Sequence, residues 1–208
     1  MNTIKTILLS TLILLLAKSS NAQNGMKEPV GYTLKNGMKI IVSENSRSPK
    51  AYASFTLDAQ AFQNKKDGIV ELLNAVLNEN VEKDANVLFM DNSAKLATNN
   101  TALDQDLTAM ASLIENAVIN QKTFNNGKAK LLASLKMQDY DYDQTVNVNS
   151  ITVLSLADVQ DFHAQISPEK TYLTVAGDVE LNNAKAAVKK AFGNWKKADK
   201  NESVSLSK

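Results

Sequence analysis

The stretch from residue 66 to 79 most constrains the fold, because its apolar residues recur with the spacing of a helix that buries one face. They stand at positions i, i+3, i+4, i+7 and i+8, namely Ile69, Leu72, Leu73, Val76 and Leu77. Upstream, Asn36-Gly37 separates two extended runs, residues 32–34 and 38–42, and this dipeptide is a strong hairpin signal. A hairpin followed by a helix with one apolar face predicts a sheet that carries helices.

The rest of the chain mixes further strands and helices. A third strand is predicted over residues 51–57, whereas residues 84–97 are ambiguous and could form two short strands around a turn at Asp91-Asn92. Further amphipathic helices are predicted at residues 103–118, 122–137, 155–166 and 181–195, with a buried strand at 171–176. Because strands and helices do not strictly alternate, we expect an α+β fold. Its sheet should be mixed, mostly antiparallel, with helices packed on one face.

The first 22 residues have the features of a signal peptide. Lys5 supplies the positive start, residues 7–17 form a short apolar core, and Ser20-Asn21-Ala22 has the small residues of a cleavage site. We therefore expect cleavage near Ala22 and export to a periplasm or beyond. Residues 23–28 are predicted to be a flexible leader, residues 29–197 a single domain, and residues 198–208 a loose polar tail.

Charge and cysteine content exclude several classes of function. The chain has 23 basic and 22 acidic residues, and loss of Lys5 and Lys18 with the signal leaves a net charge near −1. This balance predicts no nucleic-acid partner. The sequence has no second long apolar segment, so we expect no membrane insertion after cleavage. The chain has no cysteine, so no disulfide supports the fold.

The side chains that could bind a transition metal are scarce. A catalytic zinc ion needs three protein ligands, drawn mainly from His, Cys and carboxylates, and His163 is the only histidine of this cysteine-free chain. His163 could act as a general base or metal ligand, but we prefer a helix residue packed beside Phe162. The acidic run 139–143 is similar to half of a calcium loop. However, Gln144 and Ser150 stand where that loop needs Gly and Glu, so we prefer a solvated turn.

The order of several short motifs matches a known family. Residues 68–70, Gly-Ile-Val, open the first amphipathic helix after the hairpin and the third strand. Near the end of the chain, a helix ending Phe-His at His163 leads to a strand running into Gly177-Asp178, and a last helix ends Phe-Gly-Asn-Trp at Trp195. This order resembles the insulinase/pitrilysin-type zinc peptidases, whose relatives include mitochondrial processing peptidase. The resemblance covers residues 32–77 and 124–197 and implies a single metallohydrolase-like domain.

The same resemblance points to a degenerate zinc site. In the family the helix reads roughly Gly-Leu-Ala-His-x-x-Glu-His, the inverted zinc motif, and a later helix supplies a third ligand, a glutamate. Glu71, Asn74 and Ala75 stand at the motif positions here, and Ser134 stands near the position of that glutamate. We therefore predict no catalytic residue, no metal ligand set and no cofactor.

The resemblance also implies a function in protein interaction. By this resemblance, an active member of the family consists of two homologous domains that close around a peptide. This chain corresponds to one of the two domains. We expect a catalytically inactive homologue that pairs with another peptidase-like domain, as a hetero- or homodimer. Two alternatives remain open, a stand-alone peptide-binding module of the cell envelope and a divergent hydrolase whose chemistry is relocated.

Overall fold

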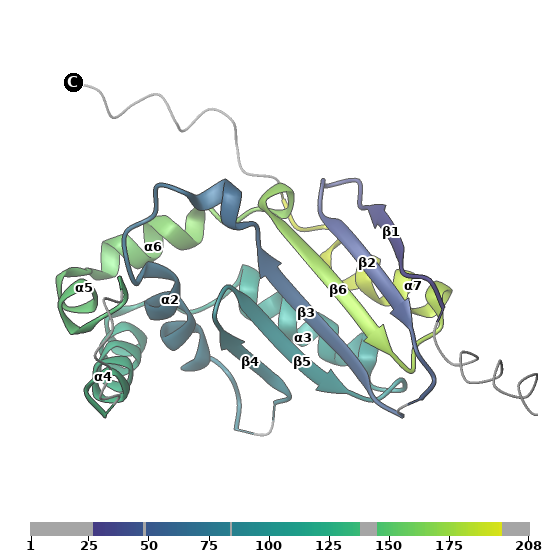
Figure 1. Cartoon of the computed structure of the whole chain (residues 1–208), viewed down its shortest axis with the longest axis horizontal. Helices are drawn as coiled ribbons and strands as arrows, with labels where there is room; N and C mark the ends of the chain where they lie inside the picture. Colours follow the sequence, from purple (N-terminus) through teal and green to yellow (C-terminus); the bar gives the residue numbers. More distant parts are fainter. Residues whose placement is uncertain (1–26, 48, 84, 138–144, 197–208) are drawn as a thin grey trace, which may run out of the picture.

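A six-stranded mixed sheet runs through the molecule (Figure 1). The computed structural model describes residues 27–47, 49–83, 85–137 and 145–196. Along the sheet the strand order is β1-β2-β6-β3-β5-β4, and all neighbours are antiparallel except β2 and β6. The strands are β1 Val30–Thr33, β2 Lys39–Glu44, β3 Ala51–Leu57, β4 Val87–Met90, β5 Ser93–Thr98 and β6 Thr171–Gly177.

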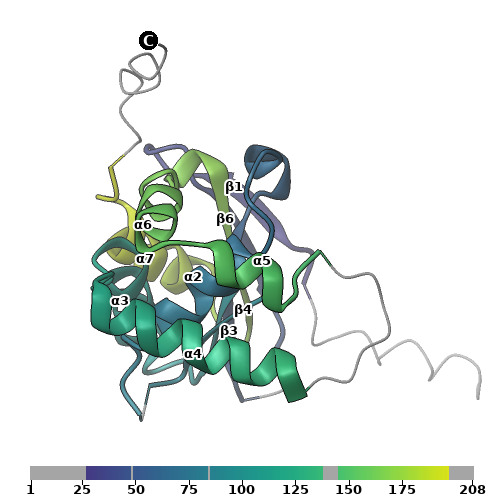
Figure 2. The same ribbon diagram turned by 90° about the vertical axis from the view of Figure 1, so that its left-hand side faces the viewer.

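The helices lie on one face of the sheet and beyond one of its edges. Two of them, α3 and α7, pack together behind the sheet in Figure 1, and no helix of the described residues covers the opposite face. Helix α2 lies beside the edge strand β4, and Figure 2 shows α4, α5 and α6 around α2. The helices are α2 Ile69–Asn78, α3 Leu103–Glu115, α4 Gln121–Met137, α5 Val148–Val153, α6 Leu156–Ala164 and α7 Leu181–Phe192, with short 3₁₀ turns η2 Ala59–Phe62 and η3 Pro168–Lys170. The α+β fold predicted from the sequence is confirmed.

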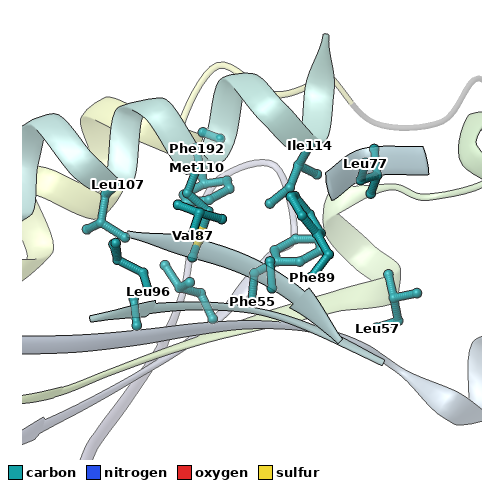
Figure 3. Close-up of a cluster of buried hydrophobic side chains, with 14 of the residues drawn as sticks. Phe55, Leu57, Leu77, Val87, Phe89, Leu96, Leu107, Met110, Ile114 and Phe192 are labelled. Carbon is teal, nitrogen blue, oxygen red and sulfur yellow. The ribbon is translucent and has the colours of Figure 1, made fainter. Parts of the chain in front are cut away.

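The buried side chains form one continuous core between the sheet and its helices. Figure 3 shows Phe55 and Phe89 of the sheet facing Met110 and Ile114 of α3. Phe55 also stacks on Phe192 of α7, with ring centroids 6.1 Å apart. The alternation of buried and exposed residues along β2 and β6 follows from the pleat, which points successive side chains to opposite faces.

Several predicted boundaries are wrong by a few residues. The first helix begins at Ile69 rather than at residue 66, because Gly68 adopts a left-handed conformation with φ 77° at its N-cap. The second ends at Glu115, and Val118, predicted to be inward, is 55% exposed. The last helix ends at Phe192 instead of continuing to residue 195.

One helix was not predicted at all. Helix α5 has only six residues, too few for an apolar period to be visible. The side chain of Asn147 caps its start by accepting hydrogen bonds from two backbone N–H groups. The next helix, α6, was predicted to begin at Ser155, and it begins there with a capping box in which the side chains of Ser155 and Asp158 accept hydrogen bonds from each other's backbone N–H.

Three sequence predictions lie outside the described residues: the signal peptide over residues 1–22, the acidic run 139–143 and the polar tail 198–208. Within the described part of the chain, no helix combines the length and the apolar content that a bilayer span requires.

Candidate functional site

The residues at the zinc-motif positions share one side of α2. Glu71, Asn74 and Ala75 follow the helical spacing i, i+3 and i+4, and Asn78 continues the row one turn later. All four are half-buried, whereas Leu72, Leu73, Val76 and Leu77 on the opposite side are buried. The structure therefore brings three of the four predicted positions together.

Two amide side chains of this row bind the neighbouring hairpin. Asn74 donates its Nδ2–H to the carbonyl of Asp91 in the β4–β5 turn at 2.6 Å. Asn78 forms two bonds with one residue of β4: it accepts from the backbone N–H of Phe89 at 3.0 Å and donates to its carbonyl at 2.8 Å. These bonds fix α2 against the edge of the sheet and engage the only neutral donor groups of the row.

Helix α4 packs closely on this side of α2 at Ala75. The contact uses Gly127, because a Cβ there would lie 2.8 Å from the carbonyl carbon of Ala75 and 2.9 Å from the backbone nitrogen of Val76. Ser134, the fourth predicted position, is exposed and follows Gly127 by seven residues, or about two helical turns. Along α4, Ser134 therefore lies about 10 Å from the contact with Ala75.

These residues do not fit a catalytic zinc ion. Glu71 is the only carboxylate of the row, Asn74 is engaged with a backbone carbonyl, and Ala75 has no donor atom. A zinc site requires three ligands and an open position for water. In the described part of the chain, no group of three or more His, Asp or Glu side chains is placed to hold a metal ion.

His163 has a structural contact that the sequence did not reveal. Its Nε2 lies 2.7 Å from the carbonyl oxygen of Ile114, so the ring donates a hydrogen bond from the C-terminal turn of α6 to that of α3. The imidazole borders two hollows of about 20 and 270 Å³, the smaller of which also touches Asn74. The sequence has no second histidine that could join His163 in a metal site. The contact of His163 joins two helices, as expected for a packed helix residue.

Another hollow lies between the segment that precedes α2 and helix α6. It has a volume of about 580 Å³ and includes none of the zinc-motif positions. Lys66 crosses it and donates to Asp158 at 2.5 Å. This bond, together with the hydrogen bonds from Ser155, lowers the pKa of Asp158 to about 2. Lys66 and Asp158 are thus paired with each other, whereas Lys65 and Asp161 also border this hollow.

Comparison with known proteins places the fold. No family model matches the sequence, and no curated protein matches it either. Solved structures do match. They include a protease from Helicobacter pylori (TM-score 0.69, 15% identity, 83% of this chain and 52% of that chain). An M16-like peptidase from Alicyclobacillus acidocaldarius also matches (TM-score 0.67, 11% identity, 80% and 50%). A third is the inactive domain of an M16 peptidase from Pseudomonas fluorescens (TM-score 0.64, 17% identity, 83% and 52%).

The chain therefore has the fold of the M16-like, insulinase-type peptidases. At these low identities the likeness concerns the fold alone. The chain spans about half the length of the solved structures that it matches.

Proposed function

We propose that this chain is an exported, catalytically inactive relative of the insulinase-type peptidases that acts as an interaction subunit. The proposal rests on the contacts made by the residues at the zinc-motif positions of α2. There Ala75 is packed against Gly127 of α4, and Asn74 is bonded to the β4–β5 turn. This side of α2 therefore offers neither the three ligands nor the open position that a catalytic zinc ion of the family's type would need.

The extent of the structural match supports the interaction role. This chain matches about half of two of the solved structures and a quarter of two others, as one domain of a multidomain peptidase would. A homologous domain supplied by a second polypeptide, or by a second copy, would complete the pair. One neighbour is itself an inactive peptidase domain, so loss of activity within this fold has a precedent.

Two measurements on the mature chain, residues 23–208, test the proposal. Peptidase activity is measured on casein and on a peptide library with and without added zinc, for wild type and Glu71→Gln. We expect no cleavage above background in any condition. Chelator-sensitive cleavage that is lost in Glu71→Gln would instead support a divergent hydrolase.

The pairing is tested separately. The mature chain is isolated from its native envelope by a mild affinity step and analysed by size-exclusion chromatography with light scattering. We expect a stoichiometric complex with a second peptidase-like domain or a homodimer. A strict monomer without such a partner would contradict the interaction role and would favour a stand-alone peptide-binding module.

A further inference from the structure

The edge strand β1 has one unpaired side. The turn bond from Leu34 N–H to the Met38 carbonyl, 2.9 Å long, fixes the alternation of hydrogen bonds between β1 and β2. Tyr32 exchanges bonds with β2, and the N–H and C=O groups of Gly31 and Thr33 therefore point away from it. Both residues are exposed, and no described residue bonds to their outward groups.

The opposite edge of the sheet is closed. In β4 the outward groups belong to Val87 and Phe89, and the amide of Asn78 occupies both groups of Phe89. This side chain takes the donor and the acceptor that an added strand would use. Figure 1 shows α2 beyond β4, whereas β1 is an end strand that pairs with β2 alone among the described strands. The two edges therefore differ in their access to a partner.

Strand β1 is protected by its short length, but not by its side chains. Natural edge strands avoid pairing by being very short, or through charged side chains, proline or bulges. The sequence of β1 is Val-Gly-Tyr-Thr, with no charge and no proline among its four residues. Pro29 immediately precedes the strand and lacks an N–H, so it limits pairing to Val30–Thr33.

Gly31 leaves a gap that a larger side chain would fill. A Cβ at Gly31 would have no neighbour nearer than the Ile40 carbonyl oxygen at 4.0 Å. On the same face of the sheet, Ile41 stands opposite Gly31 in β2 and is 39% exposed. A large apolar residue opposite Gly31 in an added strand would extend across the glycine onto Ile41.

The end of β1 is bordered by positive charge. Lys35 follows the strand in the turn, and Lys39 stands opposite Thr33 in β2. Both lysines are exposed, and neither forms an ion pair or hydrogen bond through its ammonium group with a described residue. An acidic residue beside this end of β1 would complement them.

We propose that β1 is the docking edge of this subunit, and that an extended segment of its protein partner adds beside it as a seventh strand. The segment is uncharged in its centre, has a large apolar side chain opposite Gly31, and has acidic residues that face Lys35 and Lys39. This inference rests on the proposed interaction function and specifies the surface and the partner's chemistry.

A second copy of this chain fits the edge less well. Antiparallel pairing of two β1 strands about a two-fold axis at Tyr32 would place Thr33 of the partner opposite Gly31. A threonine is too short to fill the gap above Gly31 and cover Ile41. Self-pairing would also be limited to four residues on each side, because Pro29 ends the strand.

The test uses the mature chain and a synthetic peptide, acetyl-Asp-Asp-Thr-Val-Thr-Phe-Thr-Val-Thr-Asp-Asp-amide. Amide hydrogen exchange is followed by NMR with and without the peptide. Strand addition should slow exchange at Gly31 and Thr33 by about tenfold when the peptide is at ten times its dissociation constant. Tyr32, already bonded to β2, should change little. A peptide of the same sequence with an N-methyl group on every residue from the first Thr to the last Thr has no N–H left on either edge, and it should give no protection.

Two variants connect this result to the natural partner. Thr33→Pro removes an N–H that β2 does not use, so the β1–β2 ladder is retained, and it should abolish both peptide protection and pairing with the partner domain. Thr33→Val keeps the N–H and should retain both. The exchange measurement remains informative if Thr33→Pro fails to fold.

Each outcome separates this inference from the proposed function. If the chain pairs with a peptidase-like domain but Thr33→Pro pairs equally well, the docking edge is wrong and the interaction role stands. If the chain pairs with nothing but the peptide still protects Gly31 and Thr33, the edge is confirmed and the subunit role fails. Protection that depends on protein concentration alone identifies a second copy as the occupant and overturns the heterologous partner. Absence of protection with the peptide overturns the edge.

Discussion

At the residue scale, single side chains join segments far apart in the sequence. Asn36 belongs to the β1–β2 turn, yet its amide donates to the carbonyls of Phe192 at 2.7 Å and Trp195 at 3.1 Å. Its Oδ1 accepts from the N–H of Met38 at 3.3 Å. One buried amide thus closes the turn and caps the end of α7, where carbonyl groups lack partners within the helix.

We expect Asn36→Asp to destabilise the protein at pH 7, because it replaces the donating amide with a carboxylate that faces two carbonyl oxygens. The loss should be about 2 kcal/mol in the free energy of unfolding, measured by urea denaturation. Asn182→Asp, the same change at an exposed position of α7, should stay within about 0.5 kcal/mol of wild type. Equal midpoints for the two variants would contradict a capping role for Asn36.

Gly127 offers a second test at this scale, because helix propensity and packing predict opposite signs there. Alanine is favoured over glycine by about 1 kcal/mol within a helix. However, the new methyl group would approach the backbone of Ala75 to less than 3 Å. We expect Gly127→Ala to destabilise the protein by about 1–3 kcal/mol. Asn126→Ala, at the exposed neighbouring position, should be neutral or stabilising. If thermal unfolding gives a higher midpoint temperature for both variants than for wild type, α4 does not contact α2 as described.

At the element scale, Asp158 links the start of α6 to the segment before α2. Its carboxylate accepts from Lys66, from the backbone N–H of Ser155 and from the Ser155 hydroxyl. The bond from Lys66, followed by those from Ser155, lowers the pKa of Asp158 from 3.8 to about 2. A lowered pKa in the folded state means that folding favours the ionised form, so Asp158 stabilises the fold when it is ionised.

The pH dependence of stability should report this link. The contribution of Asp158 is fully present above its unfolded-state pKa of about 3.9 and is lost as the pH falls through about 2. We expect Asp158→Asn to be less stable than wild type at pH 7, with a difference that narrows between these two pH values in urea titrations. Asp161→Asn, on the next turn of the same helix, should give a smaller difference. If the difference in unfolding free energy between wild type and Asp158→Asn stays constant with pH, the ionised Asp158 does not stabilise the fold as described.

At the scale of the whole molecule, local patterns predicted most elements and little of their arrangement. The strand predicted over residues 51–57 coincides with β3, and the ambiguous segment 84–97 contains β4 and β5 around the expected turn at Asp91-Asn92. The placement of β6 between β2 and β3 was beyond pattern analysis, because it joins residues separated by more than a hundred positions. Such long-range pairing depends on the packing of the complete core.

The candidate site was predictable to a similar degree. The family resemblance selected Glu71, Asn74 and Ala75, and the structure places them on one side of α2. The bonds of Asn78 to β4 left no sequence signal, since an asparagine in a helix has many roles. A glycine such as Gly127 indicates only low helix propensity in the sequence, and its close approach to Ala75 is visible only in three dimensions. Contacts of this kind are set by the tertiary packing of helices.

Restoring the family's residues tests the whole architecture. We expect a variant with Glu71→His, Asn74→Glu, Ala75→His and Ser134→Glu to bind no stoichiometric zinc. The first three changes face one side of α2, but Ser134 is exposed on α4 about two turns beyond the contact with Ala75, so the third ligand is missing. Zinc is measured by calorimetry and by metal analysis after dialysis, with the Ser134→Glu single variant as control. One tightly held zinc ion per chain would mean that α4 can present Ser134 to α2. The inactivity proposed here would then follow from lost side chains alone, and not from the way the helices pack.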